Sequence, residues 1–80
     1  MSTQQVASPL PGTFYRRPSP DSPPFKEEGA AVAVGDVIGL IEVMKNFQEV
    51  TAEIGGSAIR FVIEDGEAVM AGQPIAEIDP

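Results

Sequence analysis

The chain has 80 residues, 5 basic against 12 acidic, and a net charge of −7, so it can form one domain with a thin core. This charge would repel nucleic-acid phosphates and anionic membranes, which excludes both as partners. Cys and His are absent, which argues against disulfides, a metal site and self-contained catalysis.

The amino-terminal residues 1–4 are expected to be a tail, and residues 5–79 a single domain. The first residues have neither the positive charge nor the apolar run of a signal peptide. The longest apolar stretch, residues 30–44, is interrupted by Asp36 and Glu42 and is too short to span a membrane. We therefore expect a soluble protein of the cytoplasm.

Residues 6–16 are the first extended segment, and they resemble residues 50–60 weakly at an offset of 44. The loop that follows, residues 17–24, reads Arg-Pro-Ser-Pro-Asp-Ser-Pro-Pro. Each Pro removes a backbone donor and fixes its own φ, so this segment cannot be a central strand.

Residues 27–42 are repeated in residues 64–79, at an offset of 37 and with 7 of 16 pairs identical. The two offsets differ by 7, which places 7 extra residues of the first half in the 17–24 loop. Two copies cannot form an open solenoid, because such arrays need three or more units. We expect the copies to close on each other, with one half in each layer.

Strand signals recur in both copies. Residues 37–41 are apolar and rich in β-branched side chains, as in a strand covered on both faces. Ile59, Phe61 and Ile63 alternate with Ala58, Arg60 and Val62, a period of two. With turn signals about every ten residues, the sequence predicts an all-β flattened barrel or sandwich of two pseudo-twofold-related, four-stranded halves.

Residues 43–46, Val-Met-Lys-Asn, form the turn between the two copies. The turn lacks the Gly-containing pair that tight hairpins prefer, so a requirement other than turn stability selected these side chains. Lys45 is one of two lysines, with Lys26, and a lysine at a hairpin tip is accessible to a modifying enzyme.

The segment Glu42-Val43-Met44-Lys45 resembles the Glu-Ala-Met-Lys signature of biotinyl domains, in which the Lys carries biotin through an amide bond. Residues 8–21 are similar to the segment of bacterial acetyl-CoA carboxylase carriers that leads into a protruding thumb, which is the 17–24 loop here. The resemblance covers residues 5–79. Two positions depart from it, since Val43 replaces Ala and Asn46-Phe47 replaces the usual apolar Met.

The resemblance implies the biotinyl/lipoyl hammerhead fold and a carrier that is not itself an enzyme. Biotin on Lys45 would be carboxylated at a biotin carboxylase and would deliver the carboxyl group at a carboxyltransferase, for fatty acid biosynthesis. A biotin protein ligase would attach the cofactor. The implied cofactor-binding residues are Lys45, Glu42, Val43, Met44 and Asn46 around the turn, and Ser19, Asp21 and Ser22 in the thumb.

Three other interpretations stay open. A carrier of another biotin-dependent carboxylase would share every feature above. A lipoyl domain has the same fold but usually shows Asp-Lys-Ala at the turn, and Met44 and the thumb argue against it. An unmodified structural module is favoured by Val43, by Asn46 and by the lack of the Ala/Pro-rich linker that is typical before such carriers. The acidic side chains are interpreted as a solvated surface, with no catalytic pair and no metal site.

Overall fold

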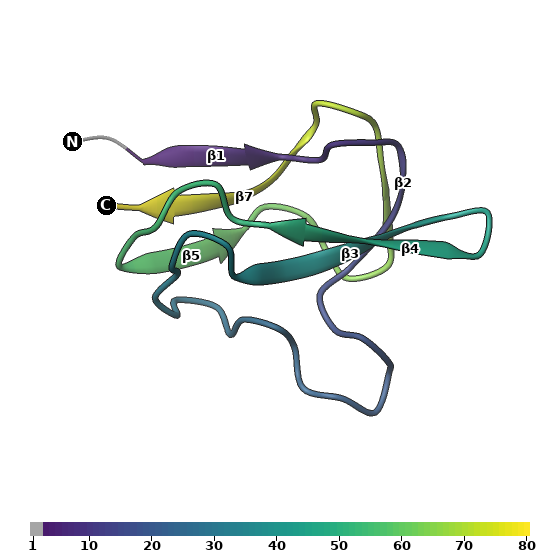
Figure 1. Cartoon of the computed structure of the whole chain (residues 1–80), viewed down its shortest axis with the longest axis horizontal. Helices are drawn as coiled ribbons and strands as arrows, with labels where there is room; N and C mark the ends of the chain where they lie inside the picture. The colour runs from purple at the N-terminus through teal and green to yellow at the C-terminus, as the bar shows by residue number, and fades with distance from the viewer. Residues whose placement is uncertain (1–2) are drawn as a thin grey trace.

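The computed structural model describes residues 3–80, which form seven strands and no helix (Figure 1). The strands are β1 (Gln4–Ala7), β2 (Gly12–Tyr15), β3 (Val37–Val43), β4 (Asn46–Thr51), β5 (Ala58–Phe61), β6 (Glu67–Val69) and β7 (Pro74–Asp79). The all-β prediction is confirmed. Residues 1 and 2 of the expected tail lie outside the described part, and β1 already begins at Gln4. Among the described residues, no helix could cross a membrane.

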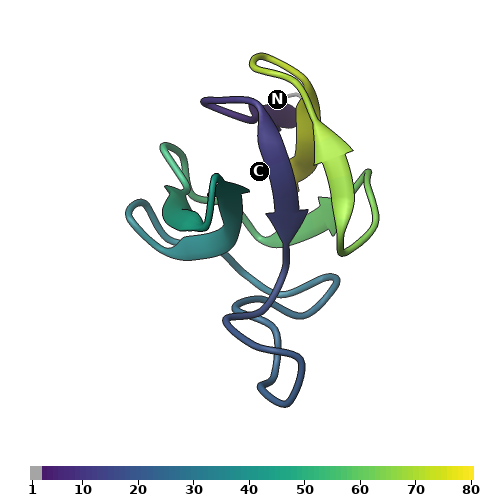
Figure 2. The same ribbon diagram turned by 90° about the vertical axis from the view of Figure 1, so that its right-hand side faces the viewer.

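Two antiparallel sheets make up the fold. Their strand orders are β1-β7-β5 and β4-β3-β2-β6 (Figures 1 and 2). The expectation that each half would supply one layer is wrong, because both sheets combine strands of both halves. The first strand of each half pairs with the last strand of the other half, β1 with β7 and β4 with β3, so the halves interlock.

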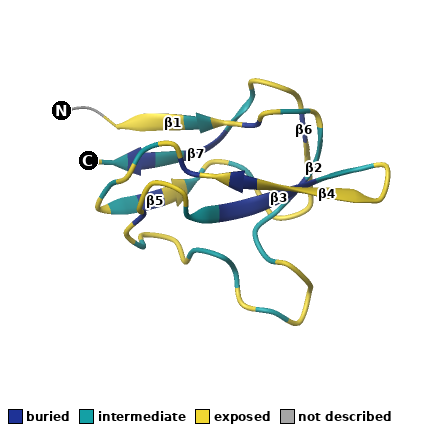
Figure 3. Ribbon diagram, viewed as in Figure 1, coloured by how far each residue is buried: buried dark blue, intermediate teal, exposed yellow. Residues whose placement is uncertain are grey.

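The core lies between the sheets, under the central strands β3 and β7 (Figure 3). Its largest fully buried side chains are supplied in equivalent pairs by the two halves: Phe14 and Ile59, Ile38 and Ile75, Ile41 and Ile78. Burying each such side chain contributes about 1.5–3 kcal/mol, which a chain without disulfides needs.

Backbone hydrogen bonds confirm the internal repeat. The Ser8 N–H donates to the Gln73 carbonyl, and the Gly72 N–H donates to Ser8. The Ala52 N–H donates to Asp36, and the Gly35 N–H donates to Ala52, in the same pattern. Residues 8 and 52 are 44 positions apart, and residues 35 and 72 are 37 apart, as the sequence repeat predicts.

A β-bulge breaks the repeat after Gly56. In the first half, Gly12 to Phe14 pair one to one with Val69 to Glu67. In the second half, Gly56 pairs with Val32 and the Ile59 N–H donates to Ala30, which leaves Ser57 and Ala58 opposite Ala31 alone. This extra residue disrupts the ladder, so the expected eighth strand is reduced to one bridge and the first sheet has three strands.

The bulge also corrects the length of the thumb. Beyond it the offset is 45, because the Phe61 N–H donates to the Glu28 carboxylate as the Arg16 N–H donates to Asp65. The first half therefore has 8 extra residues, not 7, which is the whole segment 17–24. The Phe25 N–H donates to the Arg16 carbonyl and closes the base of this loop, which projects away from both sheets (Figure 2).

Candidate functional site

The hairpin tip between the halves consists of Met44 and Lys45. The pair Val43 and Asn46 closes the β3–β4 ladder, so two residues make the turn. Both have positive φ, 51° at Met44 and 68° at Lys45, as a type I′ turn requires. A residue with a Cβ is less stable in this left-handed conformation by about 1–2 kcal/mol, because its Cβ comes too close to the following carbonyl oxygen. The fold therefore bears a local strain to place these two side chains at the tip.

The two lysines lie in different environments. The Lys26 Nζ is 2.8 Å from an Asp36 carboxylate oxygen and donates to the Ala31 carbonyl at 3.1 Å. The Lys26 ammonium lowers the pKa of Asp36. Lys45 is exposed and has no hydrogen bond or ion pair within residues 3–80. Lys45 thus offers a free amine, whereas Lys26 joins two loops.

The side chains beside Lys45 differ in their exposure to solvent. Met44 is 89% exposed, so its thioether stands in solvent next to the amine. Val43 packs partly against the core and anchors the end of β3. Asn46 is exposed at the start of β4. Val43 therefore points partly toward the core, and Met44, Lys45 and Asn46 are the more exposed side chains of the tip.

An aromatic pair lies at the base of the hairpin. Glu42 of β3 pairs with Phe47 of β4, and Tyr15 of β2 lies on the other side of β3. The Tyr15 hydroxyl donates to Glu42 Oε1 at 3.2 Å, and its ring centroid is 6.5 Å from that of Phe47. The hydrogen bond to the Glu42 carboxylate raises the pKa of Tyr15, because the acceptor favours the protonated phenol.

A slot of about 280 Å³ separates this aromatic pair from the thumb. Its walls combine thumb residues with strand residues: Tyr15, Arg17, Pro18, Ser19, Pro20, Glu42, Phe47 and Asp65. Of the three thumb residues expected to bind the cofactor, Ser19, Asp21 and Ser22, only Ser19 lines the slot. Its hydroxyl lies 2.8 Å from that of Ser22, which stands behind it, while Asp21 is exposed at the end of the loop.

Sequence reasoning missed Tyr15, Arg17, Phe47 and Asp65 as slot residues. Their proximity depends on the order β4-β3-β2, because Phe47 pairs with Glu42 on one side of β3 and Tyr15 pairs with Leu40, two residues before Glu42, on the other. Arg16 also fixes the root of the thumb, since its guanidinium carbon lies 4.3 Å from the Phe61 ring centroid and its Nη2 donates to the Lys26 carbonyl. The strongest sequence signal was the resemblance of residues 8–21, which includes Tyr15 and Arg17.

The acidic side chains form no metal centre. Among residues 3–80, no three Asp or Glu side chains come together as ligands for an ion. The site therefore consists of one free amine on a strained tip and a slot with aromatic, polar and acidic walls. Its chemistry suits covalent attachment of a group at the tip.

Comparison with known proteins gives three findings. The family model described as "Biotin-requiring enzyme" matches residues 4–78. The chain is 40% identical over 76 residues to the biotin carboxyl carrier protein of acetyl-CoA carboxylase from Nostoc sp., covering 95% of this chain and 42% of that protein. It is 39% identical over 79 residues to the protein so named from Haemophilus influenzae, covering 99% and 51%.

The chain thus spans about half or less of the length of these relatives. One solved structure, described as a single-chain, multi-domain long-chain acyl-CoA carboxylase, superposes with a TM-score of 0.69 at 21% identity. The superposition covers 98% of this chain and 7% of that one. This likeness shows that the fold recurs as a small part of a much larger protein.

Proposed function

The chain belongs to the family of biotin-requiring enzymes, and from that membership we propose that it carries biotin on Lys45 as a non-catalytic carrier. The observation that supports this most is the free amine of Lys45 on a two-residue turn with positive φ at both positions. An amide bond to this amine would join the attached group to the domain through the lysine side chain alone. Lys26 offers no comparable amine, because its ammonium holds Asp36 and Ala31.

The remaining tip residues would frame the amine for a biotin protein ligase. Met44 and Asn46 are exposed on either side of Lys45, while Val43 and Glu42 fix the end of β3. In the thumb, Ser19 would contact biotin in the slot, with Ser22 orienting the Ser19 hydroxyl and Asp21 at the rim. The slot fits this group because it offers two aromatic faces beside hydroxyl and carboxylate acceptors.

In this proposal the chain serves acetyl-CoA carboxylase in the cytoplasm. Biotin supplies a nitrogen that accepts and releases a carboxyl group, at a biotin carboxylase and a carboxyltransferase, for fatty acid biosynthesis. The protein's own contribution is positional, because a tethered group meets each enzyme at a high effective concentration. The names of the relatives support this role.

The test compares Lys45→Arg with Lys26→Arg after incubation with biotin protein ligase, biotin and ATP. We expect a streptavidin blot to detect the wild type and Lys26→Arg but not Lys45→Arg, since Arg keeps the charge without an acylatable amine. The Lys26 variant is the matched control, because it changes the only other lysine. Signal in Lys45→Arg, or an unmodified wild type by intact mass, would contradict the proposal.

A further inference from the structure

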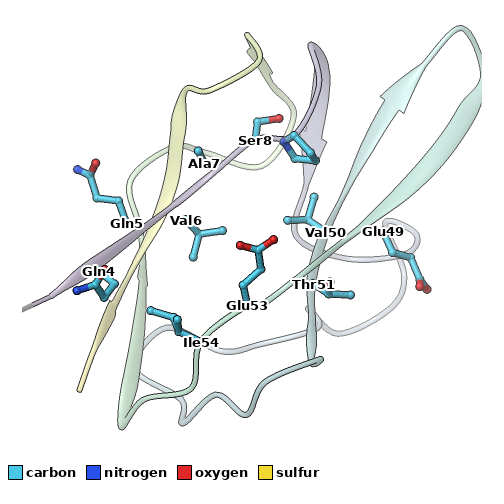
Figure 4. Close-up of a pocket in the computed structure, with 11 residues that line it drawn as sticks. Gln4, Gln5, Val6, Ala7, Ser8, Glu49, Val50, Thr51, Glu53 and Ile54 are labelled. Atoms are coloured by element: carbon cyan, nitrogen blue, oxygen red, sulfur yellow. The ribbon is translucent and has the colours of Figure 1, made fainter.

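A groove of about 600 Å³ separates the edge strands of the two sheets (Figure 4). β1 is the end strand of the first sheet, and β4 is the end strand of the second. Both line the groove, with the residues that follow each of them: Gln4 to Pro9 on one side, Glu49 to Thr51, Glu53 and Ile54 on the other. Within residues 3–80 no backbone hydrogen bond joins β1 to β4. One edge of each strand is thus available for pairing.

The floor of the groove is apolar. Val6 and Ile54 are partly buried and pack on the core cluster, and Val50 is 4% exposed within it. Figure 4 shows Val6 and Val50 projecting into the space from opposite strands. An apolar side chain placed here would lose contact with water, which is worth about 25 cal/mol per Å² of buried surface.

Two acidic side chains, Glu49 and Glu53, lie along the groove. Figure 4 places the Glu53 carboxylate in the space between Val6 and Val50, and the Glu49 carboxylate on the outer side of β4. Neither carboxylate has a hydrogen bond or ion pair within the described residues. No Lys or Arg side chain lines the groove. Two uncompensated charges in a chain of net charge −7 would attract a basic ligand.

We propose that this groove binds an extended segment of a partner protein in which basic and apolar side chains alternate. Its backbone would pair with the free edges of β1 and β4, and its apolar side chains would cover Val6 and Ile54. Its Lys or Arg side chains, on the other face of the segment, would meet Glu49, and the Glu53 carboxylate would add to the attraction from within the groove. Strand addition of this kind gains affinity from the main chain and specificity from alternate side chains. A second copy of this acidic chain lacks the complementary charge. The proposal is independent of Lys45 and of biotin.

The probe is a blocked six-residue peptide, Lys-Val-Lys-Val-Lys-Val, titrated into the isotope-labelled 80-residue chain while amide NMR shifts are followed. We expect saturable shifts confined to β1 and to residues 49–54. A peptide with Glu for each Lys should bind at least fivefold more weakly, because it meets like charge. A peptide with a central Pro should also bind more weakly, since Pro removes a backbone donor.

Matched variants separate the groove from general charge attraction. Glu49→Gln with Glu53→Gln should weaken binding about fivefold, as expected for the loss of an exposed ion pair with Glu49 and of the charge of Glu53. Glu27→Gln with Glu64→Gln removes the same charge outside the groove and should leave binding nearly unchanged. Absence of saturable binding, shifts elsewhere, equal binding of the Pro peptide, or equal effects of the two double variants would overturn the proposal.

Discussion

At the scale of single residues, the contacts of the two lysines determine which side-chain amine is free for covalent modification. Lys26 donates to the Ala31 carbonyl while its ammonium also holds Asp36. Lys45 has no such partner among the described residues. The sequence singled out Lys45 by its place at the turn between the two copies, and the packing of the loops adds that Lys26 is committed to structural contacts.

Tyr15 offers a test of the hairpin base, because it is the only Tyr in a chain without Trp. Its pKa is raised above the ordinary value of 10.0 by the hydrogen bond to Glu42. The stabilisation from this bond is therefore full below pH 10 and is lost as pH rises through the folded-state pKa. A near-ultraviolet titration of tyrosinate should show the raised pKa.

Glu42→Gln should return the pKa of Tyr15 toward its ordinary value, because a neutral acceptor disfavours the phenolate less. Glu67→Gln is the matched control, since Glu67 contacts the Glu64 backbone and not Tyr15. An unshifted titration in the wild type, or the same titration in wild type and Glu42→Gln, would show that the contact does not persist in solution.

At the scale of elements, the hairpin and the thumb are the two parts shaped by something other than the core. Met44 and Lys45 in the turn have positive φ, a backbone conformation that residues other than Gly and Asn rarely adopt. The thumb has no counterpart in the second half. Both were visible in the sequence, one as a missing Gly and the other as an insertion. The slot between them was not, because it exists only when β2 and β4 flank β3.

Replacing the tip by Met44→Asn with Lys45→Gly should stabilise the fold. Asn and Gly adopt positive φ readily, so we expect the free energy of unfolding in urea to rise by about 1–2 kcal/mol. The same variant should lose biotin attachment. Met70→Asn changes another exposed Met, in a different turn, and should give no such gain. Unchanged stability of the tip variant would show that the turn is unstrained.

Deleting residues 17–24 should leave a cooperatively folding domain. The deletion joins Arg16 to Phe25, as Phe61 is followed by Val62 in the second half, and these ends are already linked by a backbone hydrogen bond. Thermal unfolding should remain a single transition, and streptavidin should still detect Lys45 after ligation. Loss of the transition would mean that the thumb is part of the core.

At the scale of the whole molecule, the repeat explains most of what the sequence could predict. Identities between the copies marked Ile38 with Ile75 and Ile41 with Ile78, and these pairs are buried together. The sequence could not show which strands pair, because similarity identifies equivalent segments and not neighbours. It also could not show the bulge at Ser57 and Ala58, since both residues are small and carry no pattern.

The repeat predicts that two glycine substitutions behave alike. A Cβ at Gly12 would clash with the Glu42 carbonyl oxygen, and a Cβ at Gly56 with that of Asp79. Both Gly12→Ala and Gly56→Ala should lower the free energy of unfolding, by about 1–3 kcal/mol as in overpacked cores. Urea unfolding measures both, and a clear cost at only one of the two glycines would contradict this account.

The pairing of the first strand with the last also determines where a further polypeptide could join the domain relative to Lys45. Gln4 lies opposite Ile78, and the Thr3 hydroxyl donates to the Asp79 carboxylate, so both ends emerge side by side. Figure 1 shows these ends at one pole and the β3–β4 turn at the other. A polypeptide joined to either end would therefore be attached on the side of the domain opposite Lys45. When the domain moves on such a linker, Lys45 would lie at the greatest distance from the point of attachment.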